Sequence, residues 1–180
     1  MTDTLERRVR DALASVPDPE IPTCSIVDLG MVERVDVKED LVEVDLLPTF
    51  VGCPARDVIG EDVEMALRRV GEGRVVRVNF VYDPPWTTER ITEKGKAGLR
   101  ALGISPHWDE RAAGPVAIPL LRQTGTSCPY CGSTDTTMEA AFGATPCRTT
   151  HFCRACRNPF EGFKEKRSPV APPRSASTTR

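Results

Sequence analysis

Four of the seven cysteines form two Cys-x-x-Cys pairs, and this spacing predicts a metal site. Each pair presents two sulfurs to one ion, so two pairs complete a tetrahedron of thiolates at about 2.3 Å from zinc. The predicted ligands are Cys128, Cys131, Cys153 and Cys156. Because the protein supplies all four ligands, the zinc has no open coordination position. It would stabilise the fold of a small module rather than catalyse a reaction. Four thiolates also suit iron or an iron–sulfur cluster, which is the alternative.

Cys147 and His151 lie in the same segment as the paired cysteines. Both residue types can bind metal, so each must be considered as a further ligand. Cys147 is interpreted as a free buried thiol, with an alternative ligand or a site for iron as the competing interpretations. His151 is expected to face solvent or to stand beside the ligands rather than to bind the metal. Basic residues and phenylalanines in this segment would suit nucleic acid, but we prefer packing of the aromatic rings inside a ribbon.

Cys53 is the candidate for reactive chemistry outside the pairs. It precedes Pro54, and a helical pattern starts within the next few residues. Proline fits the first turn of a helix, so the Cys53 sulfur is expected near the positive end of the helix dipole. Such a position lowers the pKa of a thiol and favours the thiolate, although Asp57 opposes the effect. The rival interpretation is a cysteine that only packs.

Acidic residues gather around the first turn of the chain. Asp18, Glu20 and Asp28 are interpreted from position alone as turn formers and caps rather than as ligands. Cys24 lies among them and is expected to be a small buried residue.

The elements that must position these residues follow from hydrophobic spacing. Residues 5–16 have helical periodicity and Pro17 stops the helix, while alternation over residues 32–48 predicts a β-hairpin. The pattern further predicts a helical turn at 25–28, closed by Gly30, and a helix that ends at residue 70. A strand is predicted at 74–82. The last predicted helix starts at Thr87 or Thr88 and ends before Gly103.

These elements predict an α/β (α+β) chain. Residues 1–105 form a small two-layer α-β-β-α-β-α domain, and a four-cysteine zinc ribbon at 125–164 follows it. Residues 106–124 are expected to be a proline-containing linker and residues 165–180 a disordered tail. The first part carries 14 Lys+Arg against 20 Asp+Glu and the rest 10 against 6, which also indicates two modules.

The composition indicates the cellular compartment of the protein and argues against one class of partner. The chain has 180 residues, a net charge of −2 and no apolar run long enough for a membrane span. An odd cysteine number without a secretory signal indicates the reducing cytoplasm rather than a disulfide framework. The net charge argues against a dedicated nucleic-acid binder.

Several motifs resemble a known family. These are residues 18–22 (DPEIP), 25–30 (SIVDLG), 48–54 (PTFVGCP) and 83–87 (DPPWT). They are similar to the small-domain family of metal–sulfur cluster assembly factors. The segment 128–164 narrows the resemblance to the D-type (also called J-type) subunits of phenylacetyl-CoA oxygenases, the 1,2-epoxidases of the phenylacetyl-CoA ring. Phe50 departs from the tyrosine expected beside Cys53.

The resemblance implies an accessory or maturation subunit of that oxygenase in aerobic phenylacetate breakdown rather than its catalyst. The reactive cysteine of the family falls on Cys53, and the acidic motif on Asp18 and Glu20. Iron or an iron–sulfur cluster would be held transiently, and the ribbon zinc would be structural. The expected partners are the other oxygenase subunits, especially the iron–sulfur flavin reductase, with a homodimer as a further option. The alternatives are a structural adaptor that carries no metal and a ribbon-type nucleic-acid-binding regulator.

Overall fold

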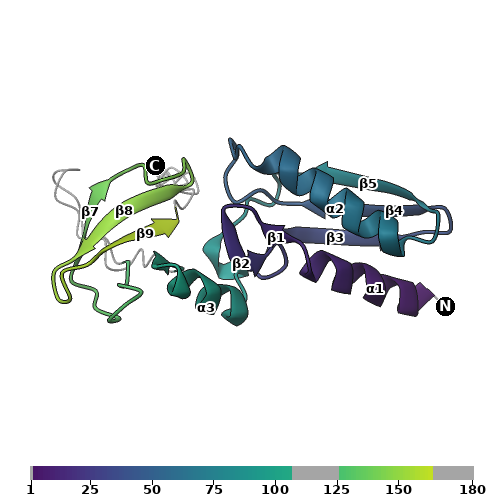
Figure 1. Ribbon diagram of the computed structural model, residues 1–180. Coiled ribbons are helices and arrows are strands. Elements are labelled where there is room, and N and C mark those ends of the chain that lie inside the picture. The colour runs from purple at the N-terminus through teal and green to yellow at the C-terminus, as the bar shows by residue number, and fades with distance from the viewer. Residues whose placement is uncertain (1, 107–125, 164–180) are drawn as a thin grey trace, which may run out of the picture.

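The structure is a computed structural model that describes residues 2–106 and 126–163. Almost all of the predicted linker (106–124) and the predicted tail (165–180) lie outside the described residues. Figure 1 shows the first domain on one side, the ribbon on the other, and α3 between them. Within the described ranges, no helix is both long enough and apolar enough to span a bilayer.

The first domain has two layers, as the sequence predicts. Helices α1 (Thr2–Ala14) and α2 (Arg56–Val70) cover one face of a sheet with the strand order β3-β4-β5 (Figure 1). The strands are β3 (Val32–Val37), β4 (Leu41–Leu46) and β5 (Val75–Phe80). The predicted hairpin is confirmed, since β3 and β4 pair antiparallel. Strand β5 runs parallel to β4, and α2 makes the crossover between them.

The acidic segment after α1 is more regular than a turn. Strands β1 (Pro17–Asp18) and β2 (Ile21–Ser25) pair antiparallel around it. A single turn follows at Ser25, where the Asp28 carboxylate accepts from the Ser25 amide and the Ser25 hydroxyl accepts from the Asp28 amide, both at 3.0 Å. This reciprocal pair is the predicted capping box, and Gly30 closes the turn with φ +66°.

The last helix of the first domain starts later than predicted. Thr87 precedes a 3₁₀ turn at Thr88–Arg90, and α3 spans Glu93–Ala101. Its N-cap is Thr92, whose hydroxyl accepts from the Gly95 amide at 3.0 Å. The Thr92 amide donates to the Asp28 carbonyl, so a contact distant in sequence selects this cap over the earlier threonines.

The ribbon is a four-stranded sheet with the order β6-β9-β8-β7. Its own strands are β7 (Thr136–Ala140), β8 (Arg148–Cys153) and β9 (Pro159–Phe163). The fourth strand, β6 (Ile104–Ser105), follows α3 and pairs parallel with β9. Phe163 also packs on Trp86 of the first domain, with ring centroids 5.5 Å apart. The ribbon is therefore attached to the first domain by strand pairing and by apolar packing.

Gly30 offers a sensitive test of the turn beside the acidic segment. A Cβ at Gly30 would lie 2.3 Å from the Arg90 carbonyl oxygen, on a backbone that already has positive φ. We expect Gly30→Ala to lower the free energy of unfolding by about 2–5 kcal/mol, the sum of left-handed strain and overpacking. Urea denaturation of the zinc-loaded chain measures this loss.

Gly73 supplies the matched control. Its φ is +83°, but a Cβ there meets no atom within 4 Å. Gly73→Ala should therefore cost only the conformational strain, about 1–2 kcal/mol. Equal losses for the two variants would show that the contact with Arg90 does not matter.

Candidate functional site

The four paired cysteines come together in the ribbon as predicted. Their sulfur atoms all lie within 4.8 Å of one another. The Sγ–Sγ distances are 3.6 Å for Cys128–Cys156 and 3.6 Å for Cys131–Cys153. A tetrahedron with ligands at about 2.3 Å has edges of about 3.8 Å, so the spacing fits one bound zinc ion. The distances are far longer than a disulfide bond, and all four thiols are free.

Local polar groups suit the cluster for metal binding. Burial raises the pKa of the Cys128 thiol to about 12, whereas hydrogen bonding by Asn158 lowers the pKa of Cys156 to about 6. Backbone N–H groups of Tyr130 and Cys131 point at the Cys128 sulfur. These donors stabilise thiolates, which are the form that binds a metal ion.

His151 is not part of this cluster, as expected, and of its two expected positions, facing solvent or standing beside the ligands, the structure excludes the first. The side chain is fully buried, stacks on Phe160 with centroids 5.2 Å apart, and places Nε2 2.8 Å from the Thr149 hydroxyl. Burial lowers the pKa of His151 to about 4, so the ring is neutral at pH 7. The alternation of β8 puts His151 on the same face as Cys153, which is the signal that could have indicated its burial.

Cys53 occupies the loop between β4 and α2. Its amide donates to the Phe50 carbonyl at 3.0 Å, and its carbonyl accepts from Arg56 at the start of the helix. The Ala55 amide hydrogen-bonds to the Cys53 sulfur, and Ala55 itself is the N-cap of α2. The side chain is half-buried, with the neighbouring Val51 49% exposed. The thiol therefore stands at a helix start, as predicted, within reach of a partner protein.

The acidic motif lies beside this loop. Asp18 is buried, and its Oδ1 accepts from the Glu20 amide at 2.8 Å. Burial raises the pKa of Asp18, and the nearby Arg148 opposes that rise. Asp18 and Glu20 both act on the Cys53 thiol through their charge.

The predicted low pKa of Cys53 is wrong. Burial raises the pKa of the thiol, and electrostatic interactions with Cys147, Asp18 and Glu20 raise it further against the hydrogen bond from Ala55. The helix start is therefore outweighed by desolvation and by neighbouring acidic groups.

Cys147 is the member of this region that local sequence patterns miss. It is half-buried in the turn just before β8, and its Sγ lies 3.0 Å from the Thr145 hydroxyl. The next residue, Arg148, donates to the Glu20 carbonyl at 2.9 Å and to Glu161 at 2.8 Å. Arg148 is thus buried between the domains rather than part of a basic ribbon face, and it holds Cys147 next to the acidic turn.

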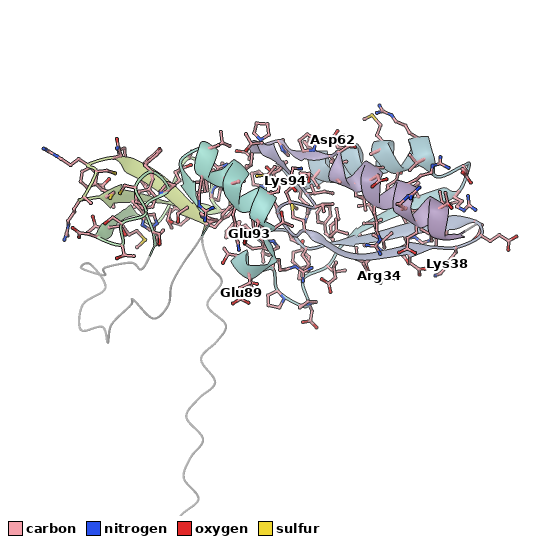
Figure 2. The ribbon with its side chains drawn as sticks, turned by 90° about the horizontal axis from the view of Figure 1, so that it is seen from below. Arg34, Lys38, Asp62, Glu89, Glu93 and Lys94 are labelled. Carbon is pink, nitrogen blue, oxygen red and sulfur yellow. The ribbon has the colours of Figure 1, made fainter. Side chains whose placement is uncertain are left out.

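The other candidates have structural roles. Cys24 is buried as predicted, and its thiol donates to the Gly95 carbonyl at 3.4 Å. Asp28 is the predicted cap, and it also accepts at 3.0 Å from Lys94. Lys94 lies on α3 (Figure 2). In the ribbon, Phe160 and Phe163 are buried, which confirms packing as the role of these aromatic rings.

Two family profiles match separate parts of the chain. Residues 6–80 match "Iron-sulfur cluster assembly protein", and residues 113–164 match "PaaD zinc beta ribbon domain". The first match contains Asp18, Glu20 and Cys53, and the second contains all four clustered cysteines and Cys147. The family match and the sulfur geometry agree on zinc in the ribbon.

Named relatives share these parts. An Escherichia coli protein, named as a D-type subunit of 1,2-phenylacetyl-CoA epoxidase, is 36% identical over 84% of this chain and 88% of its own length. The Bacillus subtilis "Fe-S protein maturation auxiliary factor YitW" is 36% identical over 58% of this chain and 99% of its own. A crystal structure of a DUF59 domain from Bacillus anthracis has 33% identity and a TM-score of 0.51, and covers 54% of this chain and 92% of that one. The chain therefore belongs to the iron–sulfur cluster assembly protein family, in the branch of the D-type epoxidase subunits that carry a zinc ribbon.

Proposed function

We propose that the chain is a maturation subunit of a phenylacetyl-CoA ring epoxidase that carries iron or an iron–sulfur cluster to the reductase or the oxygenase. The observation that carries the proposal is the half-buried Cys53 thiol on the loop before α2, which lies outside the four-sulfur cluster of the ribbon. The relatives named as maturation factors support the carrier role. The relative named as an epoxidase subunit supports the client class. Cys128, Cys131, Cys153 and Cys156 are assigned to the structural zinc.

Transfer in this proposal is an exchange of ligands without a change of oxidation state. The bond between iron and the Cys53 sulfur breaks as a bond forms between iron and a thiolate of the client. The proton that leaves the client thiol is taken up by Cys53, whose raised pKa favours the protonated thiol once the metal has gone. Asp18 and Glu20 offer oxygen ligands or hold the loop in place.

Cys53→Ser is expected to abolish delivery of iron to the client while the chain stays folded. Serine keeps the size of the side chain but is a poor ligand for iron. The assay incubates the anaerobically loaded chain with metal-free reductase and measures iron and acid-labile sulfide in the reductase. The zinc content of the variant should stay at the wild-type value.

Cys24→Ala is the control, because it removes a thiol that lies in the interior of the first domain, against α3. It should deliver iron as the wild type does. Equal delivery by Cys53→Ser and the wild type would refute the carrier role and would favour a structural adaptor, bound to the oxygenase in fixed stoichiometry whether or not Cys53 is present.

A further inference from the structure

Strand β5 is an outer strand of the first-domain sheet, and among the described residues it pairs with a strand on one side only (Figure 1). The amides of Val75 and Val81, at its two ends, donate at 2.9 and 2.8 Å to carbonyls on the β4 side. Backbone groups of successive residues in a strand point to alternate sides. The N–H and C=O groups that face away from β4 therefore belong to Val76, Val78 and Phe80.

The other outer strands of the two larger sheets are protected against further pairing. An outer strand exposes backbone groups to which another chain can pair, and bulges or a short length usually prevent this. A register shift interrupts β3 and another interrupts β7, while β6 is only two residues long. In contrast, the six residues of β5 keep one regular register against β4, include no proline or glycine, and carry one charge, on Arg77. Of these outer strands, β5 is the one suited to accept a further strand.

The apolar side chains along this edge are incompletely covered. Val76, Val78 and Phe80 pack against the core of the first domain, but each of them is only partly buried. A strand added to β5 would pair with their outward backbone groups and would remove apolar surface from water on the same edge. Both effects favour an extended segment as the occupant of this edge.

The residue pattern of β5 is complementary to itself when two copies run antiparallel. Placing Val78 opposite Val78 of a second copy sets Val76 opposite Phe80, which is a favourable pair of a β-branched and an aromatic side chain. The same register sets Arg77 opposite Asn79 and uses the outward backbone groups of all three edge residues. A shift by two residues in one direction would set Arg77 against Arg77, and like charges directly opposite are unfavourable. A shift in the other direction would leave Val76 without a partner within β5.

The side chains of Asn79 and Arg77 suit each other across this pairing. Asn79 Nδ2 donates to Glu43 at 3.2 Å and to Asp45 at 2.9 Å within its own copy. Both amide hydrogens are thereby used, so Asn79 Oδ1 is the atom that can accept from a partner. The Arg77 side chain is 58% exposed and contacts Glu43 through one nitrogen at 3.3 Å. Its guanidinium has further N–H groups to donate to the Asn79 oxygen of a second copy.

We propose that two copies of the chain associate through β5, in antiparallel pairing centred on Val78, so that two three-stranded sheets become one continuous sheet. The contact is two-fold symmetric and uses the same edge in both copies, so it closes at a dimer and does not continue into a filament. This surface is separate from the ribbon zinc cluster, and the inference does not depend on the proposed function.

Sedimentation equilibrium of the zinc-loaded, full-length chain should show dimers that dissociate on dilution. Asn79→Arg should weaken the dimer by roughly 10-fold or more, because it places like charges opposite each other on both sides of the axis. The new side chain still lies beside Glu43 and Asp45 of its own copy, so the fold and the zinc content should be retained. The exchanged double variant, Arg77→Asn with Asn79→Arg, should restore the dimer, since an arginine again faces an asparagine. The control is Asp36→Asn, which changes the net charge equally but lies on β3 and should leave the dimer unchanged.

Hydrogen exchange tests the position of the contact. In the wild-type dimer the amides of Val76, Val78 and Phe80 should exchange slowly, and in Asn79→Arg they should exchange rapidly. The Arg77 amide faces β4 and should stay protected in both proteins. A wild-type chain that remains monomeric would overturn the proposal. A dimer that leaves the three outward amides unprotected, or that Asn79→Arg does not weaken, would also overturn it, because the copies would then meet elsewhere.

Discussion

Cys153→Ala is expected to unfold the ribbon and to leave the first domain folded. The ribbon's own apolar cluster contains only Cys128, Cys153 and Phe160 among the described residues, with Cys156 packed against it. So small a core cannot offset the entropy of ordering the strands, and binding of structural zinc contributes about 10–16 kcal/mol in comparable small domains. Zinc per chain should fall to near zero, and hydrogen exchange should lose its protection in β8 and β9.

The first domain supplies the internal reference in the same exchange experiment. Helix α2 buries Ile59, Val63 and Leu67 in a separate core and should keep its protection. Cys147→Ser is the matched variant, since it removes a ribbon thiol that is outside the four-sulfur cluster. Protection of β8 that survives the loss of zinc would show that docking alone, through β6 and Phe163, is enough to fold the ribbon.

Local hydrophobic patterns predict the helices and strands that bury one face of regularly spaced apolar residues. Helix α2 and the β3–β4 hairpin follow from hydrophobic spacing because each puts its apolar residues on one side. The start of α3 does not follow, since three threonines can cap a helix there and the choice of Thr92 depends on the Asp28 carbonyl. The short pair of β1 and β2 is missed because its burial does not alternate along the strand.

The sequence likewise predicts some residues of the candidate site and misses others. The Cys-x-x-Cys spacing predicts the ribbon cluster because each pair acts as a local unit. The resemblance predicts Asp18, Glu20 and Cys53 together, and their grouping into one site stays a prediction, with Asp18 and Glu20 acting on the Cys53 thiol only through their charge. No local pattern joins Arg148 to Glu20, because their contact depends on how the ribbon docks. The pKa of Cys53 is missed for the same reason, since its direction depends on burial and on groups from other elements.

Arg148→Met is expected to weaken the contact between the two domains. The loss in the free energy of unfolding should exceed the loss from replacing an exposed charged residue. The guanidinium is buried and joins the Glu20 carbonyl to the Glu161 carboxylate. Methionine keeps much of the volume but leaves Glu161 without its cation, and breaking a buried pair costs about 3–5 kcal/mol. Glu161 is 24% exposed, so the lower end, about 3 kcal/mol, is expected. Urea denaturation of the zinc-loaded chain measures the loss.

Arg34→Met is the control. It tests whether the loss of stability depends on the burial of the arginine or on the number of its ion pairs. Arg34 lies on β3 (Figure 2). It pairs with Asp36, Glu43 and Asp45, and Asp45 and then Glu43 raise the pKa of its guanidinium. Its side chain is 48% exposed, so water replaces these partners when the arginine is removed. We therefore expect only a small fraction of the Arg148→Met loss, although Arg34 has more carboxylate partners. A larger loss for Arg34→Met would mean that the charged sheet face, rather than the contact between the domains, determines the stability of the chain.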